Sequence, residues 1–211
     1  MITLKTDAGS FEIPERLDEL TISQVFEFYA EDEKFLEGDK LNFLLSALSA
    51  VYGDVGDLPM GDIEDRFEIG SELTAFGLYR YTVELINDYA PKHRKDFIVE
   101  HHGQTYMINP QEAENIQRSV GFTVGEVITV KTFLDYAVKR KSRGLENVDF
   151  NLSLEQIATI LRKPGERLPV HVDERTRFID ARKREFADLP YPMAIDIIFF
   201  LMTITSESKT T

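Results

Sequence analysis

The chain has 211 residues, of which 43% are hydrophobic and 29% charged, so it can bury the core of one large domain or two small ones. It contains no cysteine, which excludes disulfides, thiolate metal sites and thiol nucleophiles. The N-terminal residues lack the apolar stretch of a signal peptide, and no apolar run approaches the roughly 20 residues of a membrane span, so we expect neither.

Charge is distributed unevenly along the chain, whose formal net charge is −13. Residues 1–90 contain 20 acidic and 6 basic side chains, whereas residues 91–211 contain 17 and 18. Because an acidic surface repels phosphate backbones, general nucleic-acid binding by the first half is disfavoured. The acidic half serves either solubility or contact with a partner that has a basic face.

The chain opens with a predicted β-hairpin. Ile2 and Leu4 precede a DAGS turn, and Phe11 and Ile13 follow it. This alternation of apolar and polar residues is typical of two paired strands.

Three segments share a helix-start pattern in which a hydroxyl residue is followed three positions later by Gln or Glu. In the first, LTISQVFEF (20–28), Thr21 and Gln24 form a predicted capping box, and Leu20 takes the position of a hydrophobic staple. The helix is expected from Ile22 to Asp32. The other copies are FTVGEVITV, with Phe122, Thr123 and Glu126, and LSLEQIA, with Leu152, Ser153 and Gln156.

Two further helices are predicted in the first half. Asp39 is a good N-cap for a helix over Lys40–Tyr52, whose leucines repeat at helical spacing. A short helix or turn is expected over Ile63–Ile69, and Ser71 is the predicted cap of a helix that reaches Tyr89.

A boundary between two halves, 1–90 and 91–211, is predicted at Ala90-Pro91, and the sequence leaves open whether the halves pack as one body. The second half opens with another predicted hairpin, Phe97–Glu100 and Thr105–Ile108. A hairpin, a proline and a capped helix thus occur twice. This order indicates either a degenerate internal repeat or the chance recurrence of common elements.

The remaining elements are helical. The helix from Val124 ends in a basic cluster, which either caps the helix or contacts phosphate or an acidic protein. Further helices are predicted over Leu154–Arg162, from Asp173 or Glu174 to Ala187, and over Met193–Ile204. The last is apolar on nearly all sides, as in a central helix or a contact between copies of the chain. The expected fold is mainly α, of the α+β class, with two small hairpins.

No residue could be assigned to catalysis, a cofactor or a metal from the sequence. The acids Asp54, Asp57, Asp62 and Asp65 do not have the spacing of a calcium loop, and turn formation explains them as well. Sequence motifs for nucleotide binding, zinc proteolysis and serine hydrolysis are absent.

The four histidines do not define a metal or catalytic site either. His101 and His102 are adjacent in the second hairpin, so we expect their side chains to point to opposite faces and not to share a metal. A metal site that one of them completes with His93 or Asp96 is an alternative, and His171 lies near Asp173 without a recognisable nucleophile turn.

The segment IPERLDELTISQVFEFY resembles small accessory proteins of tailed bacteriophages, especially crAss-like phages and other phages of Bacteroides. FIVEHHGQTYMINP with FTVGEVITV matches more loosely, and the end, REFADLPYPMAIDIIFFLMTIT, is similar to the closing helix of such proteins. The resemblance implies a non-enzymatic tail-assembly chaperone, ring or connector component, or packaged cargo protein. It places the chain in the virion or in the host cytoplasm during assembly.

The resemblance implies other virion proteins as partners, and the acidic half favours those with a basic face. Self-association is a further expectation, and neither a membrane nor a cofactor is implied. The alternative hypothesis is a small enzyme or regulator with an unrecognised carboxylate or histidine site, which converging acids or histidines of perturbed pKa would support.

Overall fold

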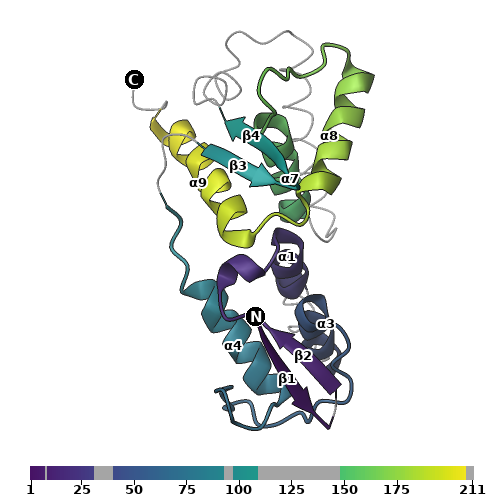
Figure 1. Cartoon of the computed structure of the whole chain (residues 1–211), viewed down its shortest axis with the longest axis vertical. Coiled ribbons are helices and arrows are strands. Elements are labelled where there is room, and N and C mark those ends of the chain that lie inside the picture. The colour runs from purple at the N-terminus through teal and green to yellow at the C-terminus, as the bar shows by residue number, and fades with distance from the viewer. Residues whose placement is uncertain (8, 31–39, 93–96, 109–147, 208–211) are drawn as a thin grey trace. The chain divides into compact units, whose positions relative to one another are not determined.

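The computed structural model describes residues 1–7, 9–30, 40–92, 97–108 and 148–207 (Figure 1). Helices dominate, and the described strands form two antiparallel hairpins, so the predicted α+β class is confirmed. In chain order the elements are β1 (Ile2–Thr6), β2 (Gly9–Ile13), the 3₁₀ helix η1 (Leu17–Glu19), α1 (Ile22–Ala30), α3 (Lys40–Tyr52), α4 (Ala75–Asn87), β3 (Phe97–His101), β4 (Gln104–Ile108), α7 (Val148–Ile160), α8 (Val172–Phe186) and α9 (Tyr191–Glu207).

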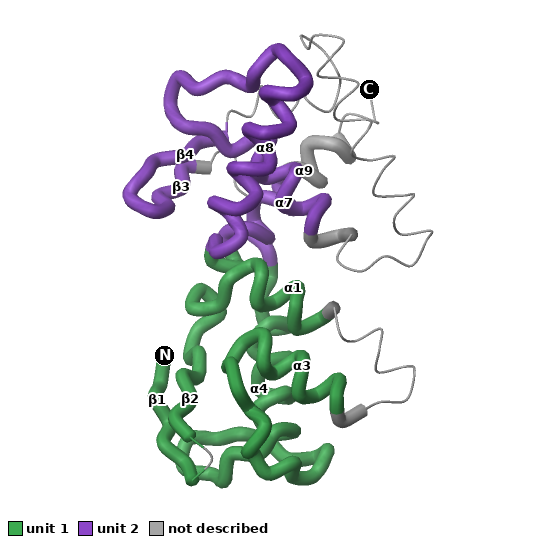
Figure 2. Tube along the Cα trace, turned by 90° about the vertical axis from the view of Figure 1, so that its right-hand side faces the viewer, with its two compact units in different colours: residues 1–90, 190–192 green, residues 91–189, 193–211 purple. Residues whose placement is uncertain are grey.

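The chain divides into two compact units (Figure 2). Unit 1 comprises Met1–Ala90 and Pro190–Pro192, and unit 2 comprises Pro91–Leu189 and Met193–Thr211. Two hydrogen bonds join Pro190–Pro192 to the rest of unit 1: the Tyr191 N–H donates to the Leu20 carbonyl at 2.8 Å, and the Tyr89 side-chain hydroxyl donates to the Pro192 carbonyl at 3.3 Å. Unit 1 is therefore discontinuous in sequence.

The first hairpin forms as predicted. β1 pairs with β2 so that Ile2 lies opposite Ile13 and Leu4 opposite Phe11. Phe11 and Ile13 are buried, which matches the apolar face that the alternation requires.

The helix-start pattern predicts one helix start correctly and one wrongly. At α1, the Thr21 hydroxyl accepts from the Gln24 N–H at 3.2 Å and the Gln24 side chain accepts from the Thr21 N–H at 2.9 Å, as predicted. The copy at 122–130 lies outside the described residues. The third prediction is wrong, because α7 already includes Val148 and Ser153 lies within it. Serine and glutamine are tolerated inside helices, so the pattern alone does not define a start.

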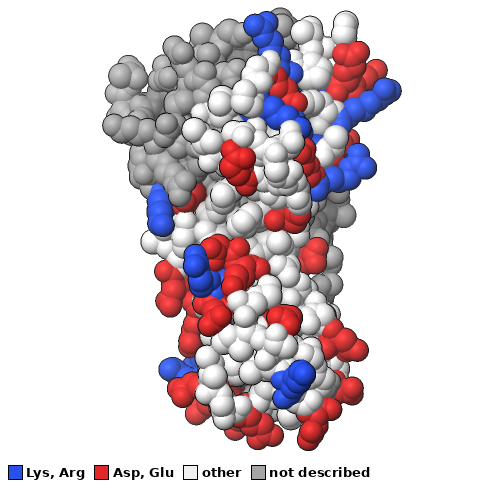
Figure 3. Space-filling model, in the orientation of Figure 1, with Lys and Arg blue, Asp and Glu red and all other residues white. Residues whose placement is uncertain are grey.

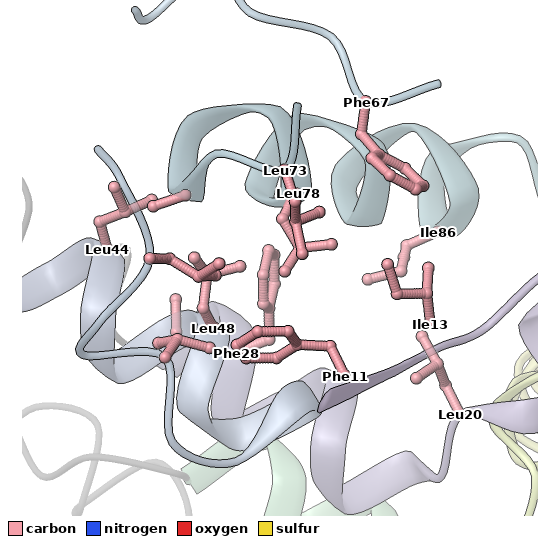
Figure 4. Packing of buried hydrophobic residues seen from close by; sticks show 14 of the residues in the cluster. Phe11, Ile13, Leu20, Phe28, Leu44, Leu48, Phe67, Leu73, Leu78 and Ile86 are labelled. Atoms are coloured by element: carbon pink, nitrogen blue, oxygen red, sulfur yellow. The ribbon is translucent and has the colours of Figure 1, made fainter. Parts of the chain in front are cut away.

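The core of unit 1 joins the hairpin to three helices. Figure 4 shows side chains from β2, α1, α3 and α4 packed together. The ring of Phe28, on α1, stacks on that of Tyr79, on α4, at a centroid distance of 5.1 Å, and Phe43 of α3 meets Tyr79 edge-on at 5.6 Å. The cluster further includes Phe11, Ile13, Leu17, Leu20, Val25, Leu44, Ala47, Leu48, Val55, Leu58, Phe67, Leu73, Ala75, Leu78 and Ile86.

The predicted cap of α4 is wrong by three residues. α4 begins at Ala75, and its N-cap is Thr74, whose hydroxyl oxygen accepts from the Gly77 N–H at 3.1 Å. Ser71 instead closes a turn, because its N–H and its hydroxyl both donate to the Glu68 carbonyl. The two hydroxyl residues look alike in the sequence, and only Thr74 has the extended backbone and the side-chain bond of the N-cap.

Replacing Thr74 by alanine is expected to lower the free energy of unfolding by about 1–2 kcal/mol, because the cap and the 3.0 Å bond that Thr74 donates to Asp65 are both lost. Urea unfolding followed by circular dichroism measures the change. Ser71→Ala is the matched control, and an equal loss in both variants would contradict the assignment of the cap.

Unit 2 is built on the second hairpin, whose extent is predicted within one residue per strand. Val99 lies opposite Tyr106 in the β3–β4 pair. Arg162, just after α7, exchanges two backbone hydrogen bonds with Met107 at 2.7 and 3.1 Å and so extends the pairing. Among the side chains whose burial is described, α7, α8 and α9 contribute the buried apolar residues Leu154, Ile157, Ala158, Ile160, Ile179, Phe186, Ala194, Ile197 and Phe200.

The first residues of α8 and α9 differ from those predicted. α8 begins at Val172 and not at Asp173 or Glu174. α9 begins at Tyr191 and not at Met193, since Pro192 is tolerated in the first turn, where its missing N–H has no partner to lose. None of the described helices combines the length and hydrophobicity of a bilayer span.

A histidine–carboxylate cluster and a buried arginine network

The two histidines of the second hairpin lie on the same side of it. His101 ends β3, and His102 (φ 48°) and Gly103 (φ 68°) form the two-residue turn before β4. Successive left-handed residues reverse the chain tightly, as in a type I′ turn. The predicted divergence of the two side chains is wrong, because alternation applies to strand residues and His102 lies in the turn.

Both imidazoles face the carboxylate of Asp188, which follows the C-terminal end of α8. Nε2 of His101 lies 3.0 Å from Asp188 Oδ1, and Nε2 of His102 lies 2.9 Å from Oδ2. The Glu185 carbonyl oxygen lies 2.8 Å from the same nitrogen of His101. His101 is buried, whereas His102 and Asp188 are about half exposed. One ligand atom from each residue lies within 4.8 Å of the other two.

Two imidazole nitrogens and a carboxylate oxygen are donors that zinc and similar divalent ions accept. Among the described residues, His101, His102 and Asp188 form the one group of three or more His, Asp or Glu side chains that converges in this way. The cluster therefore has the composition of a surface metal site.

Beside this cluster, unit 2 contains a buried arginine network centred on Arg182 of α8. Its guanidinium donates to both carboxylate oxygens of Glu166 at 2.6 and 2.8 Å, to Glu185 Oε2 at 2.5 Å and to the Tyr106 hydroxyl at 3.0 Å. The Tyr106 hydroxyl in turn donates to the other oxygen of Glu185. The guanidinium also lies 4.9 Å from the centre of the Tyr106 ring.

The network holds its groups in defined protonation states. Burial, together with the bond to Glu185, raises the pKa of Tyr106 to about 12. Burial disfavours the charged forms of Arg182 and Glu185, but the bonds to Glu166 and Glu185 raise the pKa of Arg182, and the bonds from Tyr106 and Arg182 lower that of Glu185. At neutral pH Tyr106, Arg182 and Glu185 therefore keep the protonation states that their hydrogen bonds require. This is typical of a structural network.

The remaining candidates from the sequence do not converge on a site. His93 and Asp96 lie outside the described residues, and His171 is exposed at the N-cap of α8. The acids after α3 support turns: Asp54 accepts from the Gly56 N–H, and Asp65 accepts from the N–H of Asp62 and the hydroxyl of Thr74.

Sequence reasoning missed Asp188 and the Arg182 network. A signal for the network was present, because Arg175, Ile179, Arg182 and Phe186 repeat at spacings of four, three and four residues and are all buried. An arginine on the apolar stripe of a helix indicates a buried cation with acidic partners. Asp188 had no such signal, since it follows the helix and its partners lie more than 80 residues away.

In comparisons with known proteins, no family model, no curated protein and no solved structure matches the chain.

Proposed function

We propose that the chain is a non-enzymatic bacteriophage virion or virion-assembly protein that acts through protein–protein contacts. Unit 1 binds a virion protein with a basic face. The observation that carries the proposal is the segment 53–72, which we name the acidic loop. It combines seven acidic side chains and one basic one with exposed Met60, Ile63 and Ile69.

The acidic loop is held from within unit 1. Its residues Val55, Leu58 and Phe67 are buried in the core, and the Pro59 carbonyl accepts from the Ala75 N–H at 2.9 Å. The Glu64 carbonyl accepts from the Arg80 guanidinium at 3.1 Å. A loop fixed in this way has little conformational entropy to lose on binding, which favours recognition.

The outer side of the loop suits a basic partner. Ile63 and Ile69 are 64% and 72% exposed, beside Asp62, Glu64 and Glu68, which are also exposed. Figure 3 shows that acidic side chains prevail on the drawn surface over α4 and the β1–β2 hairpin. Charge complementarity steers association, and burial of the apolar side chains supplies affinity.

The test is quantitative mass spectrometry of gradient-banded phage particles and of infected cells, with cross-linking to identify the partner. We expect the chain either in particles, at a level stoichiometric with other virion proteins, or in infected cells, cross-linked to a virion protein through the acidic loop. A gene surrounded by non-phage genes, or absence from both samples, would refute the proposal.

A matched pair of variants tests the loop with the purified partner. Ile63→Ser combined with Ile69→Ser is expected to weaken binding by about tenfold or more, because apolar area is no longer buried. Val170→Ser with Val172→Ser, which changes two similarly exposed residues of unit 2, should leave affinity unchanged. Affinity for the unaltered chain should also fall with added salt.

A further inference from the structure

We propose that His101, His102 and Asp188 bind a divalent transition-metal ion of the zinc type at the surface of unit 2. This site goes beyond the proposed function and does not depend on it. It is formed by a hairpin turn and by the residues just after α8, which bring two nitrogens and one oxygen together.

The spacing of the donors is close to that of a metal site. Bonds of about 2.0–2.1 Å in a tetrahedral arrangement place ligand atoms roughly 3.3 Å apart. His101 Nε2 lies 3.0 Å from Oδ1 of Asp188 and His102 Nε2 lies 2.9 Å from Oδ2, and one ligand atom from each of the three residues lies within 4.8 Å of the other two. Small rotations of the half-exposed side chains of His102 and Asp188 would bring the distances between the donor atoms to this tetrahedral spacing, while buried His101 stays in place.

The backbone preorganises the donors. His102 lies in the left-handed region at φ 48°, which turns its side chain back beside His101, and the two ring centres are 4.0 Å apart. His101 packs near the Phe186 ring, and its Nε2 lies within hydrogen-bond distance of both the Glu185 carbonyl and Asp188 Oδ1. A type I′ turn requires positive φ at both of its central residues, so the turn itself fixes the backbone of His102.

For an ion to bind, each imidazole must offer the lone pair of its Nε2 and carry its one ring proton on Nδ1. Three protein ligands leave at least one position for water or for a ligand from a partner, and the exposure of His102 and Asp188 keeps that position accessible.

A bound ion would connect the β3–β4 turn to the end of α8. Because only the folded chain brings the three donors together, metal binding would stabilise unit 2 by mass action. The thermal unfolding midpoint should therefore rise with zinc concentration.

The experiment uses the full chain without a polyhistidine tag, stripped with EDTA and titrated with zinc chloride by calorimetry. His102→Asn is the informative variant, because asparagine tolerates the left-handed conformation but removes the imidazole. Asp188→Asn preserves shape and removes the charge. His171→Asn is the matched control, since it changes an exposed histidine outside the cluster.

We expect one zinc ion per chain. Loss even of groups that only support a metal ligand costs about tenfold or more in affinity, so His102→Asn and Asp188→Asn should each weaken binding at least this much, while His171→Asn binds normally. The zinc-dependent rise of the unfolding midpoint should vanish in the same two variants. Equal zinc affinity in all four proteins, a loss in only one of the two cluster variants, or no binding at millimolar zinc would refute the site.

Discussion

Replacing Arg182 by methionine is expected to lower the free energy of unfolding by about 3 kcal/mol or more, because the carboxylates of Glu166 and Glu185 would remain partly buried without their cation. The Tyr106 hydroxyl would also lose the donor at 3.0 Å. The chain contains no tryptophan, so urea unfolding is best followed by far-ultraviolet circular dichroism.

Arg184→Met is the matched control on the same helix. Arg184 is exposed and donates to the backbone carbonyl of Asp180, so its replacement should change the free energy of unfolding by no more than about 0.5 kcal/mol. Adding Glu166→Gln to Arg182→Met should recover part of the loss, because a neutral amide is less costly to leave unpaired. Similar losses for the two arginine variants would show that Arg182 does not anchor unit 2.

Phe28→Ala is expected to lower the free energy of unfolding by about 3–5 kcal/mol, the range for removing a fully buried phenylalanine. Phe28 packs against Tyr79 on one side and meets Tyr29 edge-on at 5.4 Å, so truncation would leave a cavity between α1 and α4. This loss is comparable to much of the stability of an ordinary small domain.

Two variants show whether this loss comes from the cavity. Phe28→Leu should cost less than Phe28→Ala, since leucine fills part of the volume. Glu27→Ala, at the exposed neighbouring position, should stay within about 0.5 kcal/mol of the unaltered chain. Equal costs for the alanine and leucine variants would indicate that the helix relaxes into the space and that Phe28 is not the centre of the core.

The hairpins, the start of α1 and the extent of α3 could be predicted because their signals are local. Alternating apolar residues, the pair Thr21 and Gln24, and leucines at helical spacing each act within a few positions. The starts of α4 and α7 were not predictable in the same way, because a hydroxyl residue can cap a helix, close a turn or sit inside a helix. Burial of its neighbours decides among these roles, and burial is a property of the tertiary fold.

The candidate site depended on backbone geometry that the sequence does not state. The doublet of His101 and His102 was visible, but the alternation of strand residues that predicted diverging side chains does not apply to His102, which lies in the turn. His101 ends β3 and His102 begins the turn, and in this arrangement both imidazoles face Asp188. Asp188 could be added only when the fold brought the end of α8 to the hairpin.

The discontinuity of unit 1 affects the design of truncated fragments of the chain. An expression fragment that stops at Ala90 omits Pro190–Pro192 and with them the donor to the Leu20 carbonyl. Leu20 is 1% exposed, so its carbonyl would lie next to a newly opened gap. Such a fragment is therefore expected to be less stable than unit 1 in the intact chain, and a grafted linker that carries Pro190–Pro192 would restore the missing backbone groups.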